Sequence, residues 1–113
     1  MKNKAEIVVD ALEKTGVRYL FGYPGGQNAR FIEAVHGSGV EFVLVTHEAS
    51  AGFMADVTAR LTGNVGACLS TLGPGATNMT TGVGECLPGQ GSPPGLHSTN
   101  GAILERPDRA DAY

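Results

Sequence analysis

Residues 65–83 read VGACLSTLGPGATNMTTGV, an apolar run followed by a glycine-rich turn and a helical segment. The run at 65–70 is short and apolar, as expected of a buried strand. Gly73-Pro74-Gly75 then breaks the run, and a helix is predicted to begin around Ala76 and to continue through Val83. This stretch therefore predicts one strand–loop–helix unit.

Two similar units precede it, after an initial helix. The other predicted elements, in chain order, are a helix at 5–15, a strand at 17–22, a helix ending near Gly37, a strand at 41–45 and a helix at 48–61. Strands that alternate with helices favour right-handed crossovers and a parallel sheet. We therefore expect an α/β fold with three layers, a parallel sheet flanked by helices on both faces. The fold is expected to be incomplete, because residues 1–84 predict only three strands.

The loops after the predicted strands contain every candidate functional residue. In a parallel α/β sheet these loops lie at the carboxyl ends of the strands, where ligands bind. They span 23–28, 46–48 and 71–78, and their candidates are Pro24, Gly25, Gly26, Glu48 and Asn78. Each feature alone favours a structural role: a tight turn, or an acid stabilised at a helix start. The turn at 73–78 matches neither a dinucleotide fingerprint nor a phosphate-binding P-loop.

The composition excludes several classes of protein. A formal net charge of −3 argues against a nucleic-acid-binding protein, which needs a clustered basic face, and gives no reason to expect membrane binding. No run approaches the roughly 20 apolar residues that span a bilayer, and the N-terminus lacks the pattern of a signal peptide, so we expect a cytoplasmic protein. Cys68 and Cys86 form no CxxC pair, and no metal site is predicted.

Residues 85–113 differ in character from residues 1–84. They lack an apolar period and combine proline with glycine and serine, which is typical of a disordered tail. A second interpretation comes from codon degeneracy: read one base forward from Glu85, the codons permit the peptide NAYLDRAPLLAFT, which continues a helix, turns and enters an apolar strand. We therefore expect a partial domain at 1–84 and hypothesise that 85–113 is a disordered, out-of-frame tail produced by a one-base insertion.

The three loops are more specific together than separately. The segments FGYPGG, THEASAGFMADVTARLTG and STLGPGATNMTTGVG occur in this order within residues 5–84. This arrangement resembles the thiamine diphosphate-dependent enzymes of the acetohydroxyacid (acetolactate) synthase group, and specifically their N-terminal pyrimidine-binding domain. In that family the glutamate that matches Glu48 accepts a hydrogen bond from N1′ of the aminopyrimidine and thereby helps deprotonate C2 of the thiazolium ring.

The resemblance also assigns cofactor contacts. Pro24, Gly25 and Gly26 match the family loop that packs near the pyrimidine and thiazolium rings, and Asn78 matches the asparagine near the pyrimidine. His47, beside the catalytic glutamate, is either a proton carrier or part of the scaffold. The implied cofactor is thiamine diphosphate. Family members also bind Mg²⁺ and in some cases FAD, in regions that nothing in this chain matches.

The activity implied by the resemblance belongs to a larger enzyme. That enzyme joins or decarboxylates 2-oxo acids, as a transferase or lyase of branched-chain amino acid biosynthesis, and is expected to be a homodimer or homotetramer. The present fragment is expected to be inactive. Ala49 and Val57-Thr58 depart from the family pattern, so the chain could also come from a related carboligase or decarboxylase. Two alternatives stand beside this one: a split-subunit module that needs a separate diphosphate-binding partner, and a non-functional α/β remnant.

Overall fold

A computed structural model describes residues 1–84 and 100–104, within which helices and strands alternate. The elements are α1 (Lys4–Lys14), β1 (Tyr19–Gly22), α2 (Ala29–His36), β2 (Glu41–Leu44), α3 (Glu48–Thr62), β3 (Gly66–Ser70), α4 (Pro74–Gly84) and β4 (Asn100–Leu104). Every element predicted within residues 1–84 is present, and the α/β class is confirmed. None of the helices in the described ranges is both long and apolar enough to cross a lipid bilayer.

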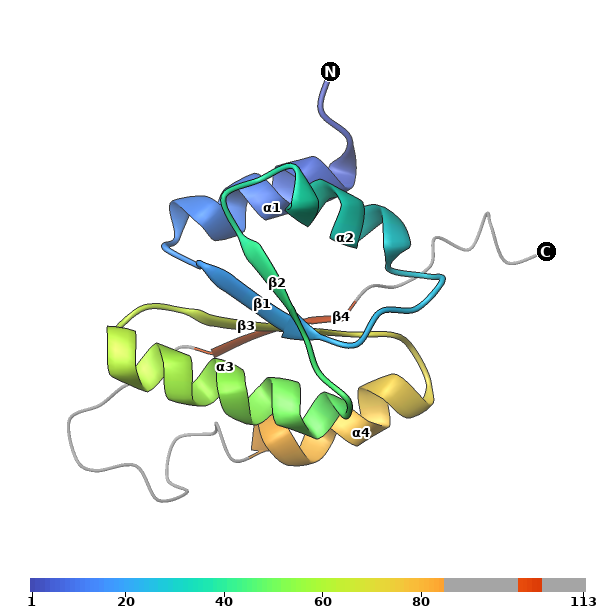
Figure 1. Ribbon diagram of the computed structural model, residues 1–113, viewed down its shortest axis with the longest axis vertical. Coiled ribbons are helices and arrows are strands. Elements are labelled where there is room, and N and C mark those ends of the chain that lie inside the picture. The colour runs from blue at the N-terminus through green and yellow to red at the C-terminus, as the bar shows by residue number, and fades with distance from the viewer. Residues whose placement is uncertain (85–99, 105–113) are drawn as a thin grey trace.

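The strands form one parallel sheet in the order β2-β1-β3-β4. Helices α1 and α2 cover one face of the sheet, and α3 and α4 cover the other, which gives the predicted three layers (Figure 1). The strands point the same way, so the loops β1–α2, β2–α3 and β3–α4 all leave the sheet at its carboxyl edge. This arrangement brings the three candidate loops to one place.

Strand β4 was not anticipated from the sequence. Residues 85–113 were expected to lack regular structure, yet Asn100–Leu104 pairs with β3 in parallel, from Gly66 opposite Asn100 to Ser70 opposite Leu104. The outer edge of β3 presents backbone N–H and C=O groups that require partners, and a short run ending in Ala-Ile-Leu can supply them. The described sheet therefore has four strands, whereas three were predicted. The other residues of 85–113 lie outside the described part of the chain.

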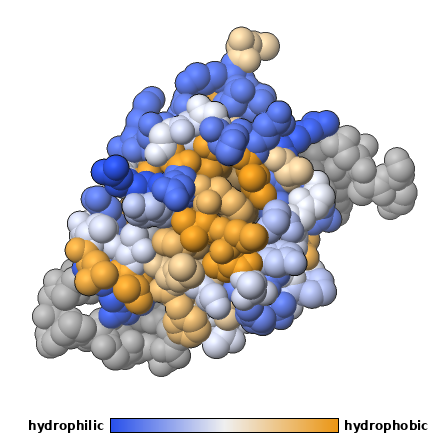
Figure 2. Space-filling model, in the orientation of Figure 1, coloured by the Kyte–Doolittle hydropathy of each residue, from blue (hydrophilic) through white to orange (hydrophobic). Residues whose placement is uncertain are grey.

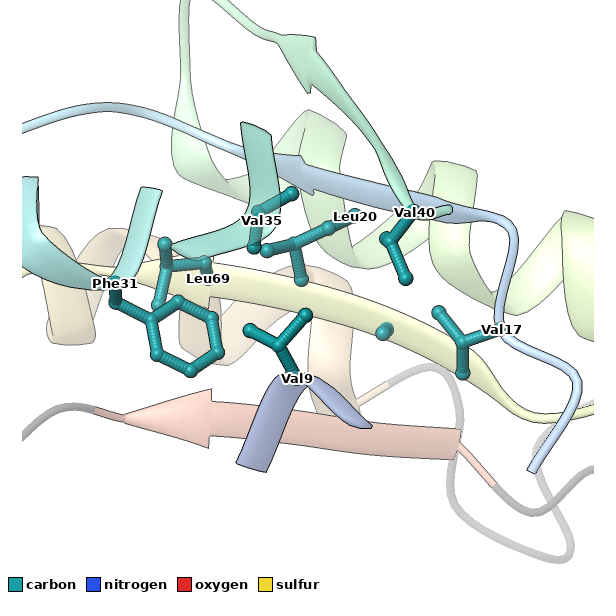
Figure 3. Packing of buried hydrophobic residues seen from close by; sticks show 8 residues of the cluster. Val9, Val17, Leu20, Phe31, Val35, Val40 and Leu69 are labelled. Carbon is teal, nitrogen blue, oxygen red and sulfur yellow. The ribbon is translucent and has the colours of Figure 1, made fainter. Parts of the chain in front are cut away.

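Two hydrophobic clusters hold the helices on the sheet. On one face, side chains from α1 and α2 converge on β1 and β3, as Figure 3 shows for Val9, Phe31, Val35, Leu20 and Leu69. The cluster on the other face contains Phe21, Val45, Ala51, Ala55, Cys68 and Met79. Neighbouring strand residues therefore alternate between the two clusters, because successive side chains of a strand point to opposite faces. This alternation fixes which face each helix covers.

Helices α3 and α4 pack unusually closely. A Cβ atom added to Gly52 of α3 would lie 2.8 Å from the carbonyl carbon of Gly82 in α4, a distance that real side chains do not tolerate. Glycine at both positions allows the two backbones to meet. Helix α3 ends at Gly63, which has a left-handed φ of 69°. The close packing brings the first turns of α3 and α4 side by side at the carboxyl edge of the sheet.

Candidate functional site

The three loops are joined by side-chain contacts at the carboxyl edge of the sheet. Glu48 is the first residue of α3, and Asn78 lies in the first half of α4. Although they are 30 residues apart, Asn78 Nδ2 donates a hydrogen bond to Glu48 Oε2 at 3.2 Å. The Glu48 side chain is half-buried and Asn78 is exposed. The structure thus brings together the two polar residues that the sequence singled out on separate loops.

The second oxygen of Glu48 faces a glycine. A Cβ atom added to Gly75 would lie 3.3 Å from Glu48 Oε1 and 2.5 Å from Thr71 Oγ1. Gly75 therefore packs tightly between the Thr71 hydroxyl and the Glu48 carboxylate, where a larger residue would clash. Thr71 is the residue that directly follows β3.

The Tyr23–Gly26 loop contacts the same threonine. A Cβ atom added to Gly25 would overlap with Thr71 Cγ2, so the backbone of Gly25 lies directly against that methyl group. Gly26 is exposed, and no atom of residues 1–84 or 100–104 lies within 4 Å of the position of an added Cβ. Pro24 is also exposed. Of the three predicted loop residues, Gly25 is thus joined to the Glu48 region through Thr71, whereas Pro24 and Gly26 are exposed.

His47 has a structural contact in this arrangement. It is the N-cap residue of α3, and its Nδ1 accepts a hydrogen bond from the N–H of Ala49 at 3.1 Å. The first N–H groups of a helix have no partner within the helix, so this contact stabilises the start of α3. Glu48 is the next residue, and the cap therefore helps to hold its backbone. Of the two roles predicted for His47, the geometry favours the scaffold.

Sequence reasoning missed three residues of this edge. Asn28 is completely buried, and its side chain binds the backbone of the Tyr23–Gly26 loop. Gln27 Oε1 accepts a hydrogen bond from the N–H of Leu72 at 3.4 Å, which connects the first loop with the third. Thr71 separates Gly25 from Gly75. All three lie within the loops defined from the sequence, but only their surroundings in space distinguish them from ordinary turn residues.

The arrangement suits the recognition of a flat, nitrogen-containing ring. A carboxylate can accept a hydrogen bond from a ring N–H, or share a proton with the ring nitrogen. One oxygen of Glu48 is held by Asn78, and the other lies near Gly75. The exposed backbone of Gly26, which carries no side chain, lets a ring approach closely. Across residues 1–84 and 100–104, no group of three or more His, Cys, Asp or Glu side chains gathers closely enough to hold a metal ion.

Comparison with known proteins assigns a family to this arrangement. The family model described as "Thiamine pyrophosphate enzyme, N-terminal TPP binding domain" matches residues 2–90. Those residues include all three loops and every candidate site residue. The resemblance recognised from the three motifs is confirmed at the level of this domain.

Several of the similar curated proteins are named acetolactate synthases. The large subunit from Haemophilus influenzae is 52% identical over 80 residues, which cover 70% of this chain and 14% of that protein. A probable large subunit from Methanocaldococcus jannaschii is 47% identical over 79 residues, or 70% of this chain and 13% of the relative. The isozyme 2 large subunit from Escherichia coli is 46% identical over 85 residues, 75% of this chain and 16% of the relative. The chain spans about one seventh of the length of these relatives.

Proposed function

Since the chain belongs to the thiamine pyrophosphate enzymes and contains part of their N-terminal TPP binding domain, we propose that it binds the aminopyrimidine half of thiamine diphosphate at the carboxyl edge of its sheet. The observation that supports this most is the hydrogen bond between Asn78 and Glu48, 3.2 Å long, which joins two of the three loops at that edge. In this proposal Glu48 is the catalytic residue, and Glu48, Pro24, Gly25, Gly26 and Asn78 contact the cofactor.

The residues present fit the pyrimidine ring. The Glu48 side chain is partly exposed, so a ring nitrogen can donate a hydrogen bond to its carboxylate or exchange a proton with it. Asn78 donates to the other oxygen and thereby orients the carboxylate. Gly26 is exposed and carries no side chain that would obstruct one face of the ring. Bound thiamine diphosphate supplies the electron sink that 2-oxo acid chemistry requires.

The activity of the whole enzyme is part of the proposal. Because the three relatives named above are acetolactate synthase large subunits, one of them a probable one, we propose that the parent enzyme joins or decarboxylates 2-oxo acids, as a transferase or lyase of branched-chain amino acid biosynthesis in the cytoplasm. Mg²⁺, the diphosphate group and any FAD would be held by regions with no counterpart here, in a homodimer or homotetramer. This chain, one seventh of such a protein, is proposed to be inactive by itself.

A titration of the isotope-labelled chain with thiamine diphosphate and Mg²⁺, followed by NMR, tests the binding proposal. We expect the amide signals of Gly25, Gly26, Glu48 and Asn78 to shift. Glu48→Gln should weaken binding by about tenfold or more, because a hydrogen bond to a charged group contributes roughly 1.5–3 kcal/mol. Glu33→Gln provides the matched control, since it makes the same chemical change at an exposed position of α2.

The outcomes separate the alternatives. Shifts that map to α1 and α2, or equal binding by wild type and Glu48→Gln, would contradict the assigned site. Binding that appears only after a separately produced diphosphate-binding domain is added would favour the split-subunit module. No binding under either condition would favour a remnant without cofactor function.

A further inference from the structure

Asn28 is a polar residue whose side chain is completely buried, with an exposed fraction of 0%. Burying a side-chain amide is unfavourable unless its donor and acceptor both find partners. Asn28 is also the N-cap residue of α2, a position where asparagine normally accepts a hydrogen bond from the first turn of the helix. Its side chain makes no such bond. The side-chain amide of Asn28 therefore does not cap α2, and its partners lie outside that helix.

That amide binds the loop that precedes it. Asn28 Oδ1 accepts a hydrogen bond from the N–H of Gly25 at 2.8 Å, and Nδ2 donates to the carbonyl of Tyr23 at 3.4 Å. In addition, the backbone N–H of Asn28 donates to the carbonyl of Gly25 at 3.2 Å. One residue thus makes three hydrogen bonds to the backbone of the Tyr23–Gly26 loop and determines its shape.

The loop held by Asn28 is also the one that meets Thr71. The backbone of Gly25 lies against the Thr71 methyl group, and Gly75 in turn lies near both the Thr71 hydroxyl and Glu48 Oε1. Gln27, the residue before Asn28, accepts the hydrogen bond from Leu72. A movement of the Asn28 side chain would therefore displace Gly25 relative to the Glu48 carboxylate, although Asn28 itself is buried.

We propose that Asn28 is a positioning residue of the cofactor site, which acts by holding Gly25 and Gly26 at the correct distance from Glu48. The proposal rests on the proposed function, because the position of the loop matters for affinity only if a ligand binds between the loop and the carboxylate. Asn28 touches no ligand in this proposal. Asn28 raises the affinity for the cofactor by holding the Tyr23–Gly26 loop in place. This role does not depend on whether Asn28 also stabilises α2.

A pair of substitutions at two N-cap asparagines tests this. Asn3 caps α1 in the usual way, since its Oδ1 accepts a hydrogen bond from the N–H of Glu6 at 2.9 Å. Serine is about as good an N-cap residue as asparagine, so Asn3→Ser and Asn28→Ser should both preserve their helices. Only Asn28→Ser removes the bond to Gly25, because the serine side chain is too short to reach the loop.

We expect Asn28→Ser to raise the dissociation constant for thiamine diphosphate by about three- to tenfold, as the loss of a typical hydrogen bond would. Hydrogen exchange at the Gly25 amide should accelerate by a similar factor. Asn3→Ser should change neither quantity. If Asn28→Ser does not fold, Asn28→Asp replaces it: this variant keeps the volume and the acceptor for Gly25 but loses the donor to Tyr23, and its affinity should lie below that of the wild type.

Three results would overturn the proposal in different ways. If the wild-type chain binds thiamine diphosphate and both Asn28 variants bind it equally well, the positioning role is wrong and the proposed function stands. If the wild-type chain binds none, with or without an added diphosphate-binding domain, the proposed function is wrong and the positioning role falls with it. A faster exchange at Gly25 with unchanged affinity would reduce Asn28 to a structural residue of the loop.

Discussion

Gly52 of α3 lies against the backbone of Gly82 in α4, so that a Cβ atom at Gly52 would come within 2.8 Å of the Gly82 carbonyl carbon. This contact is one helical turn from Glu48 and one turn from Asn78. The spacing of the two helices at the glycines therefore decides whether the asparagine amide reaches the carboxylate. The candidate site depends on two residues that would not contact the ligand.

Gly52→Ala is expected to destabilise the chain. Overpacking of this kind costs about 1–3 kcal/mol, more than the up to about 1 kcal/mol that alanine gains over glycine in a helix. Urea denaturation followed by circular dichroism measures the difference. Gly84→Ala is the control, because a Cβ atom at Gly84 meets no atom of the described residues within 4 Å. An unchanged or higher stability of Gly52→Ala would show that the two helices can separate without cost.

Asn78→Ala should weaken the binding of thiamine diphosphate while leaving stability almost unchanged. The side chain is exposed, and its hydrogen bond to Glu48 orients the carboxylate instead of supporting the core. We expect a loss of about three- to tenfold in affinity, measured by the NMR titration described above. Thr81→Ala, also at an exposed position of α4, is the control. Equal affinities for the two variants would remove Asn78 from the site.

Substitution of His47 separates the two roles predicted for it. His47→Ala removes the N-cap of α3 and should destabilise the chain by about 0.5–2 kcal/mol. His47→Asn keeps a side chain that can cap the helix but cannot carry a proton, and it should retain the stability of the wild type. If His47 is scaffold, His47→Asn should also retain the affinity for thiamine diphosphate. If His47→Asn has normal stability but binds thiamine diphosphate with an altered pH dependence, the result would instead support the role of His47 as a proton carrier.

Exposed leucines at two positions are expected to limit solubility. Leu44 lies on the edge strand β2 with 64% of its surface exposed, and Leu61 of α3 is 83% exposed. Hydrophobic residues are visible over these two regions in Figure 2. An exposed apolar edge strand favours pairing with other chains. Leu44→Lys and Leu61→Lys should therefore each raise the concentration that remains in solution after centrifugation.

The control for this effect is Thr46→Lys, at an exposed polar position. All three substitutions move the formal net charge from −3 toward zero, a change that by itself does not favour solubility. If only the leucine variants remain in solution at a higher concentration, the increase therefore comes from the removal of apolar surface. The same increase for Thr46→Lys would contradict that explanation.

The coding DNA tests the interpretation of residues 85–113. The out-of-frame hypothesis predicts that the frame one base forward from codon 85 encodes NAYLDRAPLLAFT and continues as a long open frame with apolar runs. The family match ends at residue 90, and the alignments to the three relatives described above cover 79 to 85 residues. A stop codon soon after codon 85 in the shifted frame would refute the hypothesis and leave the tail as encoded.

Much of the fold and part of the site could be predicted from the sequence alone. Short apolar runs separated by glycine-rich turns determined the strands, and helical spacing of apolar residues determined the helices, because both patterns depend on residues close together in the chain. The same reasoning placed Glu48 at a helix start and put the candidates on loops at one edge of the sheet. The order of the three motifs was enough to recognise the family.

The tertiary structure alone decided which of these residues meet. Asn78 reaches Glu48 only because two glycines let α3 and α4 pack closely. The buried amide of Asn28 looks like an ordinary helix cap in the sequence, but its partners are in the preceding loop. Strand β4 pairs with the outer edge of β3, and that edge exists only once the sheet has assembled. Local patterns encode secondary structure, whereas contacts between distant residues depend on how the finished elements pack against one another.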